Sequence, residues 1–98
     1  MRYSNPMKES FFKNGQKAIS QKGDGLTYFY KSGPVKAKGK FVGGLMQGKW
    51  VFKREDGSLW QIGHFKDNLK HGEWIRYDKT GEIEYRERFV LGKIVKRN

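Results

Sequence analysis

Two histidines are the first residues to consider for chemistry, because imidazole can bind a metal or move a proton near neutral pH. His64 and His71 lie close together in the sequence, with Asp67 between them. A metal site needs three or four converging ligands. The chain has no Cys and no further His to supply them. We therefore interpret both histidines as solvated or packing side chains, and expect no metal and no cofactor.

Nucleophilic and acid–base chemistry are no better indicated. No serine lies in a Gly-x-Ser-x-Gly turn. The glutamates within residues 82–87 are interspersed with Arg86 and Arg88, which favours cross-strand ion pairs over paired catalytic carboxylates. Residues 23–25 read Gly-Asp-Gly, without the Lys-Ser/Thr of a phosphate-binding loop. We predict that the protein is not an enzyme and has no catalytic residues.

Residues of the same type recur every 24 positions along the chain, so the structural elements that carry them must recur as well. The recurring positions are Gly33, Gly57 and Gly81, then Phe41, Phe65 and Phe89, then Gly48 and Gly72, then Trp50 and Trp74. Self-similarity at a fixed period is typical of repeat architectures, in which each unit packs on its neighbours.

Within each unit, apolar and polar residues alternate with a period of two, which is typical of half-buried antiparallel strands. We expect strands over residues 26–31, 34–42, 49–54, 58–66, 73–78 and 82–90. Glycine or Asp-Asn turns separate them. The pattern predicts an all-β fold, a single-layer antiparallel meander of successive β-hairpins. Residues 7–14 would also allow a short helical turn.

The repeat divides the single domain into four parts. Residues 1–24 form a partial N-terminal capping unit, residues 25–47 and 48–71 form the first two repeats, and residues 72–98 form the third repeat with a C-terminal cap. An isolated hairpin is marginally stable in water, so at least three units are needed.

Three sets of residues carry a family resemblance. They are Gly72-Glu73-Trp74-Ile75-Arg76-Tyr77 with Gly81, Phe89 and Gly92; Gly48-Lys49-Trp50 with Gly57, Phe65 and Asn68; and a weaker copy formed by Gly25, Tyr30, Gly33, Phe41 and Gly44. The chain resembles the MORN repeat (membrane occupation and recognition nexus), and most of all its bacterial variant in small antitoxin-type proteins. It departs from that pattern at Lys53, where a Tyr is expected, and at Thr27, where a Trp is expected.

The resemblance implies a sheet of hairpins curled into a trough, which agrees with the reading of the residues. It also implies an interaction module, with contacts to lipid, to protein or to a second copy. The residues of the three sets above would then be structural positions of the repeat. A fold-level analogy does not decide among these partners.

Candidate partner-binding residues are of two kinds: residues that depart from the repeat pattern, and basic residues. Trp50 and Trp74 occupy a repeat position and are expected to face the core. Trp60 has Lys36 and Glu84 as its counterparts one period away, so we place it on the more polar face as a binding hot spot. Alternation places basic residues on that face as well. The full candidate set is Trp60, Lys36, Lys38, Lys40, Lys66, Arg86 and Arg88.

The chain has 21 Lys and Arg against 10 Asp and Glu, for a net charge of +11. This excess fits two interpretations equally well: an acidic partner, or solvated lysines that keep sheet edges from aggregating. We expect a non-enzymatic module that binds a specific protein partner in an antitoxin-like or adaptor-like way. Alternatives are anionic lipid headgroups and, third, nucleic acid, although no nucleic-acid motif is present. A sheet edge would also allow a homodimer. No signal-peptide core or stretch of ~20 apolar residues is found, so a cytoplasmic location is expected.

Overall fold

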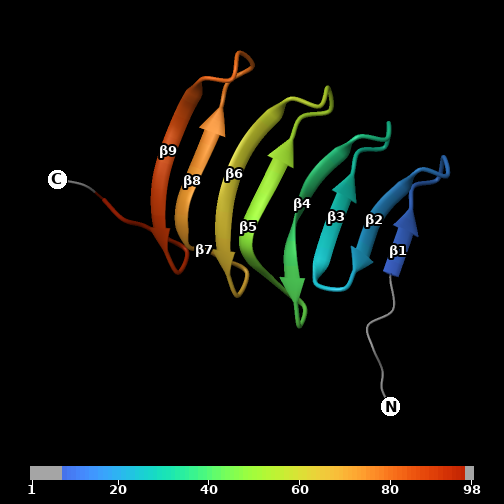
Figure 1. Cartoon of the computed structure of the whole chain (residues 1–98), viewed down its shortest axis with the longest axis horizontal. Coiled ribbons are helices and arrows are strands. Elements are labelled where there is room, and N and C mark those ends of the chain that lie inside the picture. Colours follow the sequence, from blue (N-terminus) through green and yellow to red (C-terminus); the bar gives the residue numbers. More distant parts are fainter. Residues whose placement is uncertain (1–7, 97–98) are drawn as a thin grey trace.

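The computed structural model describes residues 8–96, and within them the chain forms one open antiparallel sheet and no helix (Figure 1). The strands are β1 (Lys8–Phe11), β2 (Lys17–Lys22), β3 (Gly25–Phe29), β4 (Val35–Val42), β5 (Leu45–Lys53), β6 (Leu59–Lys66), β7 (Leu69–Lys70), β8 (Gly72–Tyr77), β9 (Ile83–Val90) and β10 (Lys93–Ile94). Neighbours in sequence are neighbours in the sheet, and the two-residue β7 pairs with β6 beside β8. The predicted all-β meander of hairpins is confirmed.

Five of the six expected segments match a strand to within two residues, and β1, β2, β7 and β10 lie outside all six. The segment expected at residues 49–54 begins at Leu45, because the chain stays paired across Gly48. Gly48 has a φ of 63°, and the register with β4 shifts there, so the glycine makes a bulge within a longer strand. A glycine between two alternating segments can therefore mark an irregularity inside one strand.

The short helical turn considered for residues 7–14 is wrong for the part that the structure describes. Residues 8–11 form β1, which pairs with β2 through Glu9 opposite Ser20 and Ser10 opposite Ile19. The chain reverses around Gly15, whose φ is 90°. This reversal places residues 8–11 antiparallel to β2, so their backbone groups form hydrogen bonds with β2 in a hairpin. Residue 7 lies outside the described residues.

The turns have the backbone geometry that the glycine and Asp-Asn positions predicted. Gly57 and Gly81 have φ values of 91° and 92° at equivalent positions of two units. The β6–β7 turn instead uses Asp67 and Asn68, with φ values of 50° and 72°. Asn and Asp tolerate this left-handed region better than other side chains do, so the turn keeps the geometry without glycine.

All the buried side chains of the described residues lie on one face of the sheet. They are Leu26, Ala37, Trp50, Trp74 and Phe89. The register places Leu26, Gly39, Trp50 and Gly63 side by side across four strands, and Gly63 is followed by Trp74. We call this side the aromatic face; it also carries Tyr28, Phe41, Phe52 and Phe65.

The position equivalent to Trp50 in the first repeat is Leu26, not Thr27. Leu26 pairs with Gly39 as Trp50 pairs with Gly63, and both side chains are buried. Thr27 instead lies one residue along the strand and so points to the opposite face. The first repeat therefore fills the Trp position with a smaller apolar side chain.

The sheet is thin and curved. Its Cα atoms extend 51 × 35 × 16 Å, and β4, β6 and β9 bend along their length (Figure 1). A single layer has no second sheet to cover its core, so neighbouring rings on the aromatic face must cover one another. The described residues contain no helix long and apolar enough to cross a membrane.

Candidate functional site

The centre of the aromatic face is a continuous stack in which tryptophans and phenylalanines alternate. Trp50 contacts Phe65 edge-on with 6.1 Å between ring centroids, Phe65 contacts Trp74 at 5.1 Å, and Trp74 contacts Phe89 at 6.5 Å. Edge-to-face arrangements of this kind add to the free energy gained by burial. Phe65 and Phe89 are therefore linked to each other through the intervening Trp74.

Both repeat tryptophans are structural, as expected. The Trp50 indole Nε1–H donates to the Lys40 carbonyl oxygen and the Trp74 indole to the His64 carbonyl oxygen, each at 2.9 Å. Trp50 is fully buried and Trp74 is 3% exposed. Neither indole has free surface to offer a partner.

Trp60 lies on the aromatic face, so its expected place on the more polar face is wrong. Phe52 pairs with Gln61 but Lys53 pairs with Leu59, which leaves Trp60 as the extra residue of a β-bulge. A bulge inserts one residue and shifts the alternation of side chains. The same bulge falls at Lys36 and at Glu84, one period before and after.

Trp60 and Lys36 line one groove on this face, with a volume of about 330 Å³. Its walls are Tyr28, Tyr30, Lys36, Ala37, Met46, Trp50, Phe52, Lys53 and Trp60. The Lys36 ammonium lies 5.7 Å from the centre of the Tyr30 ring. The groove is therefore an aromatic depression with two lysines among its walls and no acidic residue.

Beside this groove, Arg76 lies between two aromatic rings. Its guanidinium carbon is 5.6 Å from the Trp60 ring centre and 5.0 Å from the Tyr85 ring centre. Both rings are partly open to solvent, with 36% and 37% exposure. Arg76 and Tyr85 were not among the residues singled out from the sequence. The signal was present, because Arg76 stands where Phe52 and Tyr28 stand one and two periods earlier.

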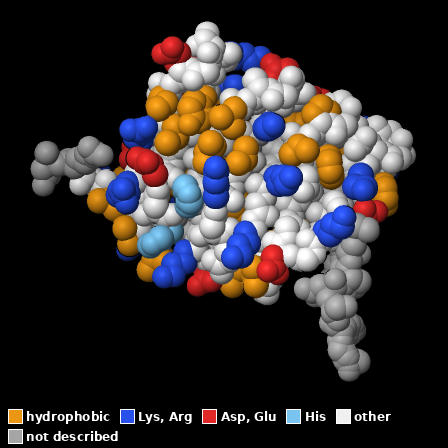
Figure 2. All heavy atoms as spheres, in the orientation of Figure 1, with side chains coloured by type: hydrophobic (Ala, Val, Ile, Leu, Met, Phe, Trp, Pro, Cys, Tyr) orange, Lys and Arg blue, Asp and Glu red, His pale blue; other side chains and the backbone are white. Residues whose placement is uncertain are grey.

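The other basic candidates lie on the opposite face, which we call the basic face. It carries Lys38, Lys40, Lys49, His64, Lys66, Arg86 and Arg88. Lys36 does not belong to this set, because its bulge turns it to the aromatic face. Figure 2 shows the molecule from one side. Lys and Arg side chains form a band across it, and hydrophobic side chains gather on one side of the band.

Few of these charges are neutralised locally. Arg86 Nε lies 3.6 Å from a Glu73 carboxylate oxygen, in a pair whose side chains are half exposed. Such a pair contributes little to stability. A row of partly buried apolar side chains, Val51, Ile62 and Ile75, crosses this face and is flanked by Lys38 and Arg86.

The two histidines have structural contacts. His64 Nδ1 lies 3.2 Å from the Glu73 carbonyl oxygen on the neighbouring strand. His71 Nδ1 accepts a hydrogen bond from the Leu91 backbone N–H at 3.1 Å, which ties the residue between β7 and β8 to the turn after β9. Among residues 8–96, no three His, Asp or Glu side chains converge in a way that could hold a metal ion.

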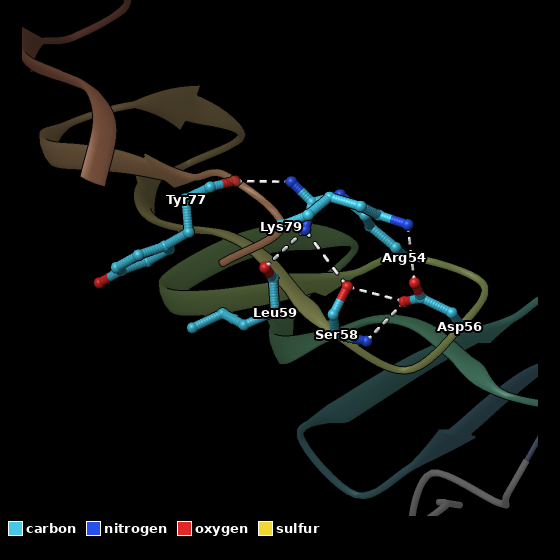
Figure 3. Close-up of polar contacts among 6 residues, drawn as sticks. All are labelled: Arg54, Asp56, Ser58, Leu59, Tyr77 and Lys79. Atoms are coloured by element: carbon cyan, nitrogen blue, oxygen red, sulfur yellow. Dashed lines mark hydrogen bonds and ion pairs between the residues drawn. The ribbon is translucent and has the colours of Figure 1, made fainter. Parts of the chain in front are cut away.

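Polar side chains tie the turns of adjacent repeats together (Figure 3). Asp56 accepts hydrogen bonds from the Ser58 backbone N–H and hydroxyl at 2.9 and 2.7 Å, and its other oxygen pairs with the Lys79 ammonium at 2.9 Å. The hydrogen bonds from Lys79 and Ser58 lower the pKa of Asp56 well below its usual range. Arg54 reaches the Tyr77 carbonyl oxygen at 2.6 Å, in the next hairpin.

Asp78 lies in the corresponding turn of the next repeat, at the position that Arg54 has in the first of these turns. It accepts hydrogen bonds from the Thr80 hydroxyl at 2.7 Å and from the backbone N–H groups of Thr80 and Glu82. These bonds, that of the Thr80 hydroxyl above all, lower the pKa of Asp78. The carboxylates with lowered pKa values are therefore turn-stabilising groups rather than acids or bases poised for catalysis.

The open repeat sheet, its aromatic stack and its turn ties define a hairpin-repeat protein. Two adjacent segments, residues 46–67 and 70–90, match the family model described as a MORN repeat variant. Repeats of that family are non-enzymatic modules that contact proteins or membranes. The predicted resemblance is thus supported for two adjacent repeats. Searches of curated proteins and of solved structures gave no significant match.

Proposed function

We propose that this protein is a non-enzymatic interaction module that binds one specific protein partner, in the manner of an adaptor or antitoxin. The binding surface is the groove on the aromatic face beside Trp60. The observation that carries this proposal is that Trp60, a third of which is exposed, lines an aromatic groove at a bulge position where the other repeats carry Lys36 and Glu84.

Three properties of the groove support a protein ligand. Tryptophan and tyrosine supply large contact areas at low conformational cost, and they dominate binding hot spots. The groove rests on Trp50 and Phe52, which are held by the central stack, so its floor is rigid before binding. The family's repeats are interaction modules, which agrees with this use of the sheet.

The alternative is a peripheral binder of anionic lipid headgroups, with the basic face against the membrane surface. The observation in its favour is that Lys38, Lys40, Lys66, Arg86 and Arg88 share one face. Nucleic acid would use the same charges and is the third candidate. Both of these modes need the basic face and leave Trp60 free.

Affinity capture with matched variants separates these functions. The tagged protein, a Trp60→Ala variant and a basic-face variant (Lys38, Lys40 and Lys66 all changed to Glu) are each incubated with lysate of the protein's own cells. The beads are washed at low salt and then at about 0.3 M salt, where charge-driven contacts are screened. Protein, lipid and nucleic acid are quantified in each fraction.

We expect one stoichiometric protein to survive the high-salt wash on the wild-type and basic-face proteins and to be lost with Trp60→Ala. Capture of lipid or nucleic acid alone, removed by salt and abolished in the basic-face variant, would refute the proposal in favour of the alternative. The triple variant is the matched control, because its three side chains are exposed and lie on the other face.

A further inference from the structure

Two departures from the repeat meet in space at Arg76. Arg76 stands at the repeat position where Tyr28 and Phe52 are aromatic. Trp60 stands at the bulge position where an earlier repeat carries the charged Lys36. These two exceptions lie on neighbouring strands, and the guanidinium of Arg76 packs against the Trp60 ring. Tyr85, on the strand beyond, covers the guanidinium from the other side.

One N–H donor of Arg76 has no partner in the described part of the chain. Its Nε is the one buried side-chain nitrogen or oxygen of the described residues that has no hydrogen-bond partner. None of the ion pairs found among residues 8–96 includes Arg76. A buried donor without a partner is unfavourable. Because Nε itself is buried, an incoming acceptor would meet the terminal nitrogens of this guanidinium, which none of those ion pairs engages.

The chemistry of this acceptor follows from the guanidinium group. Arginine presents a planar fork of N–H donors that matches the two oxygens of a carboxylate. The rings of Trp60 and Tyr85 limit the orientations of that fork, so less freedom is lost when a ligand binds. A carboxylate would bind the terminal nitrogens of the fork, because Nε is buried whereas Arg76 as a whole is partly exposed.

The adjoining groove shows what the carboxylate belongs to. Trp60 is shared by the arginine site and by the groove, so one ligand can occupy both. The groove offers apolar rings, the cations Lys36 and Lys53, and no carboxylate. An acidic segment with an apolar side chain is complementary to this combination in both charge and shape.

We propose that Trp60, Arg76 and Tyr85 form a recognition site for an Asp or Glu side chain in an extended, acidic segment of the protein partner. A neighbouring apolar side chain of that segment enters the groove beside Trp60. This inference rests on the proposed function, because it names the partner chemistry for the same surface.

Selection from a random-peptide phage library tests the site without knowledge of the partner. The full chain is immobilised, and selected peptides are sequenced and resynthesised. We expect peptides that carry Asp or Glu next to an aromatic or aliphatic residue. Affinity should fall at least tenfold with Arg76→Gln, and by a similar factor when the peptide's acidic residue is changed to its amide. The two changes together should cost little more than either alone, because they remove the same contact.

Further variants keep the test decisive. Arg76→Lys keeps the charge but loses the planar fork, so it should bind more weakly than wild type and better than Arg76→Gln. If Arg76→Gln does not fold, Arg76→Lys and the amide peptide decide. Tyr85→Ala should weaken binding several-fold, whereas the basic-face triple variant should bind normally.

The outcomes separate this inference from the proposed function. Selected peptides that lose binding with Trp60→Ala but carry no acidic residue, or bind Arg76→Gln as well as wild type, would overturn the inference and leave the proposed function intact. Failure to select any peptide, or peptides indifferent to Trp60→Ala, would contradict both.

Discussion

The indole of Trp74 lies directly over Gly63, so close that a Cβ atom on Gly63 would collide with the ring. Trp50 and Gly39 are related in the same way one repeat earlier. Each tryptophan therefore locks its hairpin onto the preceding hairpin through a position that must remain without a side chain. Glu87 stands at this position in the last repeat, where no further tryptophan follows among the described residues.

Gly63→Ala should destabilise the protein by about 1–3 kcal/mol, because the methyl group overpacks the site under Trp74. Urea unfolding measures this change. Gly25→Ala is the control, since its new methyl group would meet only the Lys22 carbonyl oxygen, at an ordinary distance of 3.5 Å. That variant should stay within about 0.5 kcal/mol of wild type. Equal losses in the two would contradict the packing account.

The stabilities of two alanine variants should distinguish the structural tryptophan, Trp50, from the binding tryptophan, Trp60. Trp50→Ala removes a fully buried ring and should cost about 3–5 kcal/mol. Trp60→Ala removes a ring at the rim of the groove and should cost about 1 kcal/mol. Thermal unfolding followed by circular dichroism measures both. A Trp60→Ala protein that fails to fold would make Trp60 a core residue.

Asn68 ties its own turn to strand β5 and holds an unusual backbone conformation at the same time. Its Oδ1 accepts the Met46 backbone N–H at 2.7 Å, and its φ is 72°. Asn68→Ala loses the hydrogen bond and strains the turn, at about 2 kcal/mol in total. Asn68→Gly loses only the bond, at about 1 kcal/mol. Gly44 and Gly92 fill the equivalent positions, so the glycine variant restores the repeat's own residue. An alanine variant as stable as the glycine variant would contradict this reading.

The turn carboxylates should make stability fall in acid. Hydrogen bonds lower the pKa of Asp78 in the folded state, so its stabilising effect is present above the ordinary Asp pKa of about 3.9 and is lost as the pH falls through the lower, folded value. Asp78→Asn should therefore flatten the decline in stability below about pH 4. Urea midpoints at a series of pH values measure it, with Asp24→Asn as a control at another exposed turn. An unchanged pH profile would contradict the assignment.

Much of the fold could be predicted from the sequence because the contacts of a hairpin repeat are local. Alternation located β6 and β9 almost to the residue, and the 24-residue period located their turns. The faces of Trp60 and Lys36 could not be predicted in the same way. A bulge adds one residue to a strand, so alternation counted across it assigns the wrong face.

The candidate site could therefore be predicted only in part from the sequence. Trp60 could be found, because it departs from its counterparts in the repeat. Its partner Arg76 departs in the same way, but the pairing of the two depends on the β6–β8 register and on the bulge. The sequence shows which residues depart from the repeat, but the structure is needed to show which of these residues contact one another.

Site-specific photocrosslinking in the protein's own cells tests most directly which face binds the partner. A photoreactive phenylalanine analogue is placed at position 60, on the rim of the groove, or at position 38, which is exposed on the basic face. Adducts with one discrete protein from position 60 and none from position 38 are the result that we predict. Adducts from position 38 alone, or from neither position, would contradict the assignment of the aromatic face as the binding surface.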